Sequence, residues 1–288
     1  MTRPLLLTGA TGFVGRHVLR HLRRRRVPVR VVVRRGSEHR LEGLEGLEGA
    51  EGLERVIVTD DLFAEDAAWW RACCADVDTV LHAAWFAEPG RYLQAPENLA
   101  CLQGTLQLAR GAADAGLRRF VGVGTCFEYD LAQGTPPGHF SVNTPLRPTT
   151  TYAACKASAF LTLSSWLKTK SIEFLWCRLF YLYGEGEDAR RLVPYLRARL
   201  SAGEAAELTS GTQVRDFLDV DVAASLLVDA AIGSAQGARN VCSGEGITVR
   251  ALAEQIADDY GRRDLLRFGA RPDNLVDPPC VVGVVEAR

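Results

Sequence analysis

The sequence predicts an α/β fold built on a doubly wound parallel sheet. Short runs rich in leucine and β-branched residues alternate along the chain with segments of helical pattern. Such alternation is typical of parallel strands joined by crossover helices. A glycine-rich turn follows the first run, and the alternation becomes irregular after about residue 178. The 288 residues suffice for one large domain with a smaller appendage.

The expected elements follow in chain order. The apolar runs predict strands at 4–9, 27–34, 54–60, 77–85, 118–125 and 172–180. The helices are predicted to begin near residues 13, 64, 97, 152 and 187. The repetitive tract at 41–54 carries glycine at a density that weakens helices, so we expect a surface connection or a frayed helix there.

Composition limits the class of partner. Basic residues number 34 and acidic residues 35, which predicts no general attraction to nucleic acid or to an anionic membrane. The four arginines at 23–26 should close a helix, with a nucleic-acid-binding arm as the alternative. Eight cysteines without metal-ligand spacing argue against a zinc site and a disulfide framework. With no apolar stretch near the roughly 20 residues of a membrane span, we expect a soluble, cytoplasmic protein without metal.

The turn after the first strand indicates a dinucleotide site. "LLLTGATGFVGRHVLRHL" places Gly9, Gly12 and Gly15 between a buried strand and a helix. These glycines permit a tight turn, close approach of a pyrophosphate and close helix packing, and the helix N-terminus stabilises the anion. We therefore expect a Rossmann-type fold. The predicted cofactor contacts here are Gly9, Thr11, Gly12, Phe13, Val14 and Gly15.

The irregular second half predicts a smaller part that binds substrate. Its glycine- and proline-rich segments interrupt the strand and helix pattern. Residues 1–178 are expected to form the dinucleotide-binding domain, with 212–235 returning to it. Residues 179–211 and 236–288 are expected to form an interleaved substrate-binding subdomain, with the ligand between the two parts.

A tyrosine and a lysine lie one helical turn apart in "TTYAACKAS". Tyr152 and Lys156 occupy positions i and i+4, which share one face of a helix. The ammonium could lower the pKa of the phenol. An ordinary exposed pair on an amphipathic helix is the alternative interpretation.

The spacing GxxGxxG together with Tyr152-x-x-x-Lys156 resembles the extended short-chain dehydrogenase/reductase family, also called the NAD-dependent epimerase/dehydratase family. The resemblance implies that Tyr152 is the catalytic acid/base and that Lys156 binds the nicotinamide ribose and lowers the tyrosine pKa. It implies that Thr125 of "GVGTCFEYD" hydrogen-bonds the reacting oxygen. The remaining cofactor contacts that it implies are Asp61, Leu62, His82, Ala83 and Ala84.

The end of the second strand bears on the choice of cofactor. An NAD-selective site commonly has Asp or Glu there, whereas this chain has Arg34 and Arg35. Two arginines favour the 2′-phosphate of NADP(H), with NAD(H) as the alternative. They could instead simply solvate the end of the strand.

The segment after Thr125 bears on the reaction. The family's 4,6-dehydratases have an Asp-Glu pair there, and this chain has Cys126 and Phe127, so dehydration is not expected. Glu128 is one place out of register and should point elsewhere. "QVRDFLDVDVA" resembles the segment whose arginine, here Arg215, contacts a diphosphate, while its three aspartates should cap or orient the next helix. The expected substrate contacts are Trp85, Cys126, Phe127, Tyr181, Val193 and Arg215.

A narrower resemblance, carried by "HAAWFAEPGRYLQAPENL" and "GTCFEYD", is to a subgroup of sugar-nucleotide 4-ketoreductases or epimerases, of which we favour the ketoreductases. It implies NADPH-dependent reduction of the C4 keto group of a nucleotide-linked 4-keto-6-deoxyhexose, with dTDP as the expected nucleotide, by a homodimer. The alternatives are an NAD-dependent sugar-nucleotide 4-epimerase and a non-catalytic dinucleotide-binding protein. One departure is Cys101 where the family often has asparagine, and Asn98, one turn earlier, could substitute for it.

Overall fold

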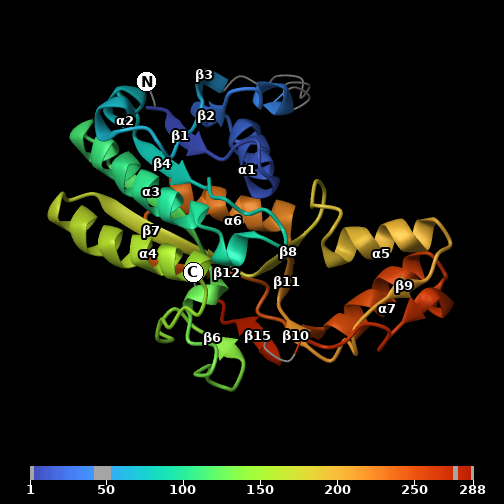
Figure 1. Cartoon of the computed structure of the whole chain (residues 1–288). Helices are drawn as coiled ribbons and strands as arrows, with labels where there is room; N and C mark the ends of the chain where they lie inside the picture. Colours follow the sequence, from blue (N-terminus) through green and yellow to red (C-terminus); the bar gives the residue numbers. More distant parts are fainter. Residues whose placement is uncertain (1–2, 42–52, 275–277, 287–288) are drawn as a thin grey trace.

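The computed structural model describes residues 3–41, 53–274 and 278–286 (Figure 1). Most of the tract predicted as a connection or frayed helix, 42–52, lies outside the described residues. In the described part, a seven-stranded parallel sheet has the order β12-β7-β5-β4-β1-β2-β3. Its strands are β1 (Leu5–Thr8), β2 (Val29–Arg34), β3 (Leu53–Thr59), β4 (Thr79–His82), β5 (Arg119–Thr125), β7 (Glu173–Leu179) and β12 (Gly237–Val241).

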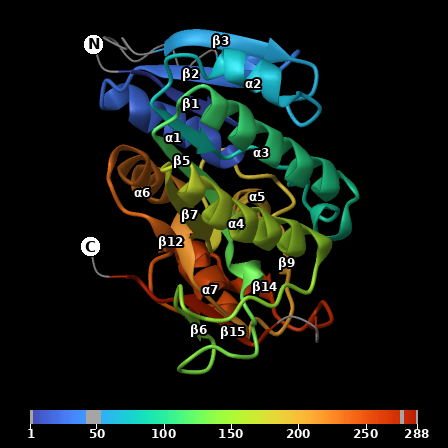
Figure 2. The same ribbon diagram turned by 90° about the vertical axis from the view of Figure 1, so that its left-hand side faces the viewer.

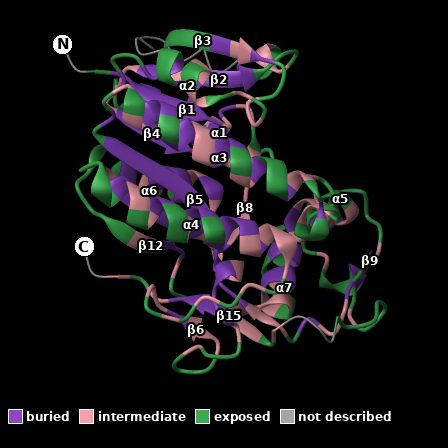
Figure 3. Ribbon diagram, turned by 60° about the vertical axis from the view of Figure 1, so that its left-hand side comes forward, coloured by how far each residue is buried: buried purple, intermediate pink, exposed green. Residues whose placement is uncertain are grey.

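Helices cover both faces of this sheet. One face carries α2 (Ala67–Cys73), α3 (Glu97–Asp114) and α4 (Thr151–Thr169), and the other carries α1 (Phe13–Arg24) and α6 (Val220–Ile232) (Figure 2). Leu6 of β1 packs in the first of these layers, while Leu5 and Leu7 pack in the second. The central strands β1, β4 and β5 are buried along their whole length, whereas the edge strands β3 and β12 are only partly buried (Figure 3).

The smaller part is built from short elements beyond β7. It contains β8 (Tyr181–Tyr183), α5 (Leu192–Ser201), β9 (Ala206–Glu207), β10 (Val214–Arg215), β11 (Phe217–Asp219), β13 (Ile247–Thr248), α7 (Val249–Asp259), β14 (Leu266–Arg267) and β15 (Cys280–Gly283). β6 (His139–Phe140) joins β15 at the edge of a four-stranded sheet of order β13-β10-β15-β6. Short 3-10 turns are η1 (Glu38–Leu41), η2 (Tyr92–Gln94), η3 (Cys126–Glu128) and η4 (Arg263–Leu265). α5 and α7 share a separate apolar core.

The predicted fold class and all six predicted strands are confirmed, but two details differ. A helix beginning near residue 187 was wrong, because α5 begins at Leu192. Gly184 and Gly186 have φ of 140° and 82°, which places a turn there instead. The strand β12 was not predicted, and it lies in the large sheet although it falls within the 236–288 range expected for the smaller part. The division into two domains stays a prediction.

Candidate cofactor and catalytic site

The turn from β1 to α1 lies at the point where strand order reverses, between β1 and β4. Gly9 has φ of 78°, and a Cβ there would lie 2.7 Å from the Ala84 nitrogen. A Cβ on Gly15 would lie 1.9 Å from the Gly9 oxygen, so both positions require glycine. The N-cap residue of α1, Gly12, is exposed and contributes no capping side chain, and the first turn has no acidic residue. The first N–H groups of α1 therefore suit a pyrophosphate.

A buried histidine lies beneath this turn. His82 Nδ1 is 2.8 Å from Thr8 Oγ1, and its Nε2 is 2.9 Å from Thr105 Oγ1. Since the Thr105 hydroxyl donates to the Cys101 carbonyl at 2.7 Å, its oxygen accepts the proton of His82 Nε2. Thr8 Oγ1 also accepts the Ala84 N–H at 3.3 Å. Burial lowers the pKa of His82 to about 3, so this neutral imidazole links the ends of β1 and β4 to α3.

Tyr152 and Lys156 lie on the first turns of α4. The Lys156 side chain is buried, and its Nζ donates to the Val123 carbonyl at 2.6 Å. The same nitrogen lies 3.9 Å from the centre of the Trp85 ring, a cation–π distance. Lys156 is therefore fixed between β5 and the segment after β4, rather than exposed as in the alternative interpretation.

Burial shifts the pKa of both members of this pair. It raises the pKa of Tyr152 above its ordinary value, and Tyr92 and Glu128 act in the same direction. Burial also lowers the pKa of Lys156 to about 7. Burial disfavours the charged form of both groups and so opposes the lowering of the Tyr152 pKa expected from Lys156, which stays a prediction.

Thr125 ends β5 and faces Tyr152. A hydrogen bond with the Thr125 side chain acts against the rise in the Tyr152 pKa. Thr125 Oγ1 also accepts the Phe127 N–H at 3.3 Å, and the Thr125 N–H donates to Glu128 Oε1 at 2.9 Å. The structure thus brings the three predicted catalytic residues together.

Tyr92, which was not predicted, lies beside Tyr152, and Asn98, named as a possible substitute for the family's asparagine, holds it. The ring of Tyr92 lies edge-on to that of Tyr152, with centres 4.9 Å apart. Asn98 Nδ2 donates to the Tyr92 carbonyl at 2.6 Å, and its Oδ1 accepts Trp85 Nε1 at 2.8 Å. Asn98 therefore holds together the segment that covers the tyrosine.

Three of the predicted substrate contacts form one aromatic and cationic group. The Phe127 and Tyr181 rings are 6.1 Å apart, and the Arg215 guanidinium lies 5.3 Å from the centre of the Tyr181 ring. Cys126 packs beside them, and burial raises the pKa of its thiol to about 12, so it offers no acid or base at neutral pH. Val193 instead packs in the core between α5 and α7.

The aspartates of "RDFLDVD" have three different roles. Asp219 caps α6, accepting the Asp221 N–H at 2.7 Å, as predicted. Asp221 pairs with His17 and His21 of α1. Asp216, predicted to cap or orient α6, does not cap it, since Asp219 is the N-cap residue. The buried carboxylate of Asp216 accepts backbone N–H groups of 243, 244 and 283 at 2.7, 2.9 and 3.1 Å, which ties β10 to β15.

The residues predicted to select the cofactor lie at the carboxyl ends of β2 and β3. Arg34 is exposed, and Arg35 Nε pairs with Asp60 Oδ1 at 2.5 Å while remaining accessible. Asp61 is exposed and accepts the Phe63 N–H at 2.9 Å. Both guanidinium groups can reach an anion at this edge of the sheet.

Neither a metal site nor a membrane span is found within residues 3–41, 53–274 and 278–286. No group of three or more His, Cys, Asp or Glu side chains in those residues could hold a metal ion. None of the described helices is both long and apolar enough to cross a membrane.

Comparison with known proteins agrees with this geometry. The chain is 24% identical over 285 residues to dTDP-6-deoxy-L-talose 4-dehydrogenase (NAD(+)) of Aggregatibacter actinomycetemcomitans, covering 97% of this chain and 98% of the relative. It is 28% identical to GDP-6-deoxy-D-mannose reductase of Pseudomonas aeruginosa, covering 90% and 80%. A solved dTDP-glucose 4,6-dehydratase from Streptomyces venezuelae, with NAD bound, superposes with a TM-score of 0.82 at 23% identity over 98% of this chain and 88% of that one. The sequence pattern of the NAD dependent epimerase/dehydratase family matches residues 5–240, and the chain belongs to this family.

Proposed function

We propose that the protein reduces the C4 keto group of a nucleotide-linked 4-keto-6-deoxyhexose, with dTDP as the nucleotide and NADPH as the reductant. The observation that carries the proposal is the meeting of Thr125, Tyr152 and Lys156 beside Cys126 and Phe127, which supply no second acid or base. The two curated relatives act on 6-deoxy sugars linked to dTDP or GDP, as their names state, which supports the substrate class.

The residues divide the work of a ketone reduction. A bound nicotinamide would supply the hydride to the keto carbon. Tyr152 would give its phenolic proton to the keto oxygen, which becomes the hydroxyl, and Thr125 would hold that oxygen. Lys156 would hold the nicotinamide ribose.

We propose NADP(H) as the cofactor on the strength of Arg34 and Arg35. Both guanidinium groups are accessible at the carboxyl end of β2, where a 2′-phosphate would lie. NAD(H) is the alternative, since one relative is named for NAD(+) and the solved dehydratase holds NAD.

The decisive assay follows NADPH absorbance when the protein meets dTDP-4-keto-6-deoxyglucose, with NADH in parallel. We expect rapid oxidation of NADPH. Tyr152→Phe removes only the phenolic hydroxyl and should lower turnover roughly 10²- to 10⁴-fold while cofactor affinity is retained. Full activity in Tyr152→Phe would show that the assigned mechanism is wrong. A tightly bound NAD in the purified protein would instead favour the 4-epimerase.

We further propose a homodimer formed through α3 and α4. Leu99 on α3 and Leu161 on α4 are 61% and 58% exposed, which is unusual for leucine on helices that otherwise pack well. Light scattering should give twice the chain mass of 31.4 kDa. A monomer at working concentration would contradict this.

We also propose a cytoplasmic location. The described cysteines are all free thiols, which supports it.

A further inference from the structure

Glu128 is a buried carboxylate that the proposed reaction does not use. It is 0% exposed and lies three residues after Thr125. Its Oε1 accepts the Thr125 N–H and the Trp176 Nε1–H, each at 2.9 Å. Its Oε2 accepts Arg178 Nε at 2.7 Å. A buried charge costs stability unless it is paired and hydrogen-bonded, and here both carboxylate oxygens have partners.

Glu128 fixes the backbone from which the Thr125 hydroxyl projects. The Thr125 side chain accepts a backbone N–H of η3, and the Glu128 side chain accepts the Thr125 N–H in return. This reciprocal arrangement is a capping box on a single turn. Because Thr125 is hydrogen-bonded to Tyr152, holding the threonine also holds its contact with the tyrosine.

Glu128 also supplies negative charge to the site. The ionisable groups that face Lys156 are Glu128 from η3, Cys101 from α3, His82 from β4 and Tyr152 from its own helix. Burial raises the pKa of the Cys101 thiol to about 11 and lowers the pKa of His82 to about 3, so both are neutral at pH 7. Glu128 is left as the group that opposes the effect of burial on the Lys156 pKa.

Arg178, the ion-pair partner of Glu128, is itself held in place by aromatic rings. Its guanidinium lies between the rings of Tyr129 and Phe160, 4.8 Å and 4.5 Å from their centres, and its Nη1 donates to the Tyr129 hydroxyl at 3.3 Å. The guanidinium is therefore fixed beside the Glu128 side chain.

We propose that Glu128 is a positioning residue for the site, which orients Thr125 and directs a negative charge toward Lys156. The inference takes the roles of Thr125, Tyr152 and Lys156 from the proposed function. In this inference Glu128 takes no part in the reaction itself, but it acts on Thr125 and Lys156, which do.

The three lysines of the chain make a direct test practical. Only Lys156, Lys168 and Lys170 contribute signals when the protein is labelled with ¹³Cε-lysine, and the last two are exposed. We expect the Lys156 resonance to titrate near pH 7. In Glu128→Gln the midpoint should fall by about one pH unit. Glu173→Gln removes another carboxylate paired with arginine and should leave the midpoint unchanged.

An unchanged Lys156 midpoint in folded Glu128→Gln would overturn the proposal. Should that variant not fold, Glu128→Met combined with Arg178→Met removes the charge with residues of similar volume, and the same midpoint decides. In the reductase assay, turnover should depend on pH through the protonation of Lys156. In Glu128→Gln the midpoint of that pH dependence should fall by the same amount as the midpoint of the Lys156 resonance. Failure of wild-type turnover would reject the proposed function, whereas the lysine titration would still test the role of Glu128.

Discussion

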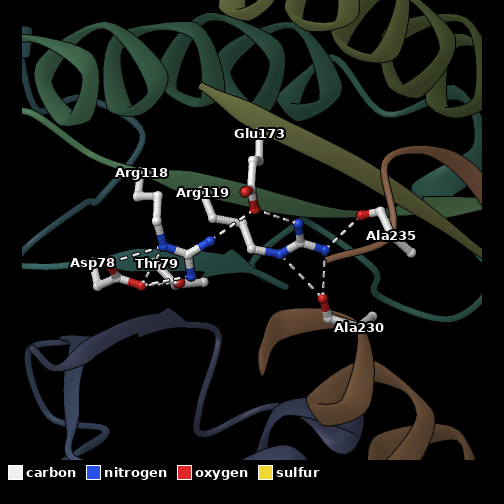
Figure 4. Close-up of polar contacts among 7 residues, drawn as sticks. All are labelled: Asp78, Thr79, Arg118, Arg119, Glu173, Ala230 and Ala235. Carbon is white, nitrogen blue, oxygen red and sulfur yellow. Dashed lines mark hydrogen bonds and ion pairs between the residues drawn. The ribbon is translucent and has the colours of Figure 1, made fainter. Parts of the chain in front are cut away.

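Two arginine–glutamate pairs join β5 to β7, one at each end of the strands. At the amino end, Arg119 of β5 pairs with Glu173 of β7 at 2.9 Å (Figure 4). At the carboxyl end, Arg178 of β7 pairs with Glu128, just beyond β5, at 2.7 Å. Both guanidinium groups are almost fully buried, but Glu173 is 29% exposed whereas Glu128 is 0% exposed.

The two pairs differ in what else supports them. Arg119 also donates to the Ala230 carbonyl at 2.8 Å and to the Ala235 carbonyl at 2.6 Å, so it closes the end of α6. Arg178 Nη2 has no hydrogen-bond partner among the described residues. The amino-end arginine can lose its carboxylate and keep other acceptors. Without Glu128, Arg178 would keep the Tyr129 hydroxyl as an acceptor, at 3.3 Å, and this pair adjoins Thr125. Burial of an ion pair therefore does not by itself indicate its role.

Truncating each glutamate should produce the largest contrast. Glu128→Ala leaves Arg178 charged and buried, and we expect a loss of about 3–5 kcal/mol in the free energy of unfolding. Glu173→Ala should cost about 1 kcal/mol, because Arg119 keeps its carbonyl acceptors. Urea unfolding of both variants gives the comparison. Equal losses would mean that the two pairs are energetically alike.

Removing both members of a pair should reduce the difference in stability loss between the two ends of the strands. Arg178→Met alone leaves Glu128 buried without its cation, and adding Glu128→Met should restore part of the loss. We expect a coupling of about 1–3 kcal/mol at this end. Arg119→Met with Glu173→Met should show a coupling of less than about 1 kcal/mol, since water reaches Glu173. Double-mutant cycles, measured by urea unfolding, give both coupling energies. Similar values would mean that the buried pair and the partly exposed pair do not differ in energy.

Lys156, near the carboxyl-end pair, should make the free energy of unfolding depend on pH above neutrality. The folded-state pKa of Lys156, about 7, lies below its unfolded value, so the unfolded chain binds more protons between about pH 7 and pH 10. Stability should therefore rise with pH in this window, by on the order of 1 kcal/mol per pH unit at most. Lys156→Met should abolish this rise, and exposed Lys168→Met should retain it. A rise that persists in Lys156→Met would place its origin elsewhere.

Local patterns in the sequence predicted most strands of the large sheet and the glycine-rich turn after the first strand. Five of the six predicted strands lie inside the sheet, where burial on both faces favours runs rich in apolar residues. The strand that escaped prediction, β12, reads "GARNV" and forms the edge of the sheet, where burial demands less. The glycines of the first turn and the spacing of Tyr152 and Lys156 were likewise readable, because each lies within one short segment.

The contacts that join distant segments could not be predicted in this way. Glu128 meets Arg178 across 50 positions, and Tyr92 meets Tyr152 across 60. One signal was available, since Arg178 interrupts the apolar run "FLWCRLF" of a predicted buried strand, and a buried cation requires a partner. Nothing local identified Glu128 as that partner. The raised pKa of Tyr152 also depends on burial that only the packed structure reveals.

The smallest effect is expected at the outer rim of the amino end. Arg118 Nη2 lies 2.7 Å from Asp78 Oδ2, with the two side chains 47% and 30% exposed. The hydrogen bond from Arg118 holds the pKa of Asp78 below its ordinary value, so the pair stabilises above about pH 4 and loses its effect as pH falls. Asp78→Asn should cost less than about 1 kcal/mol at neutral pH, and 1 M salt should erase the difference because the charges are exposed. The cost of Glu128→Ala should persist in the same salt, because ions do not screen a pair from which solvent is excluded. If 1 M salt removed the stability losses of Asp78→Asn and Glu128→Ala equally, the Arg178–Glu128 pair would be accessible to solvent in solution. The two ends of the sheet would then not differ in the burial of their ion pairs.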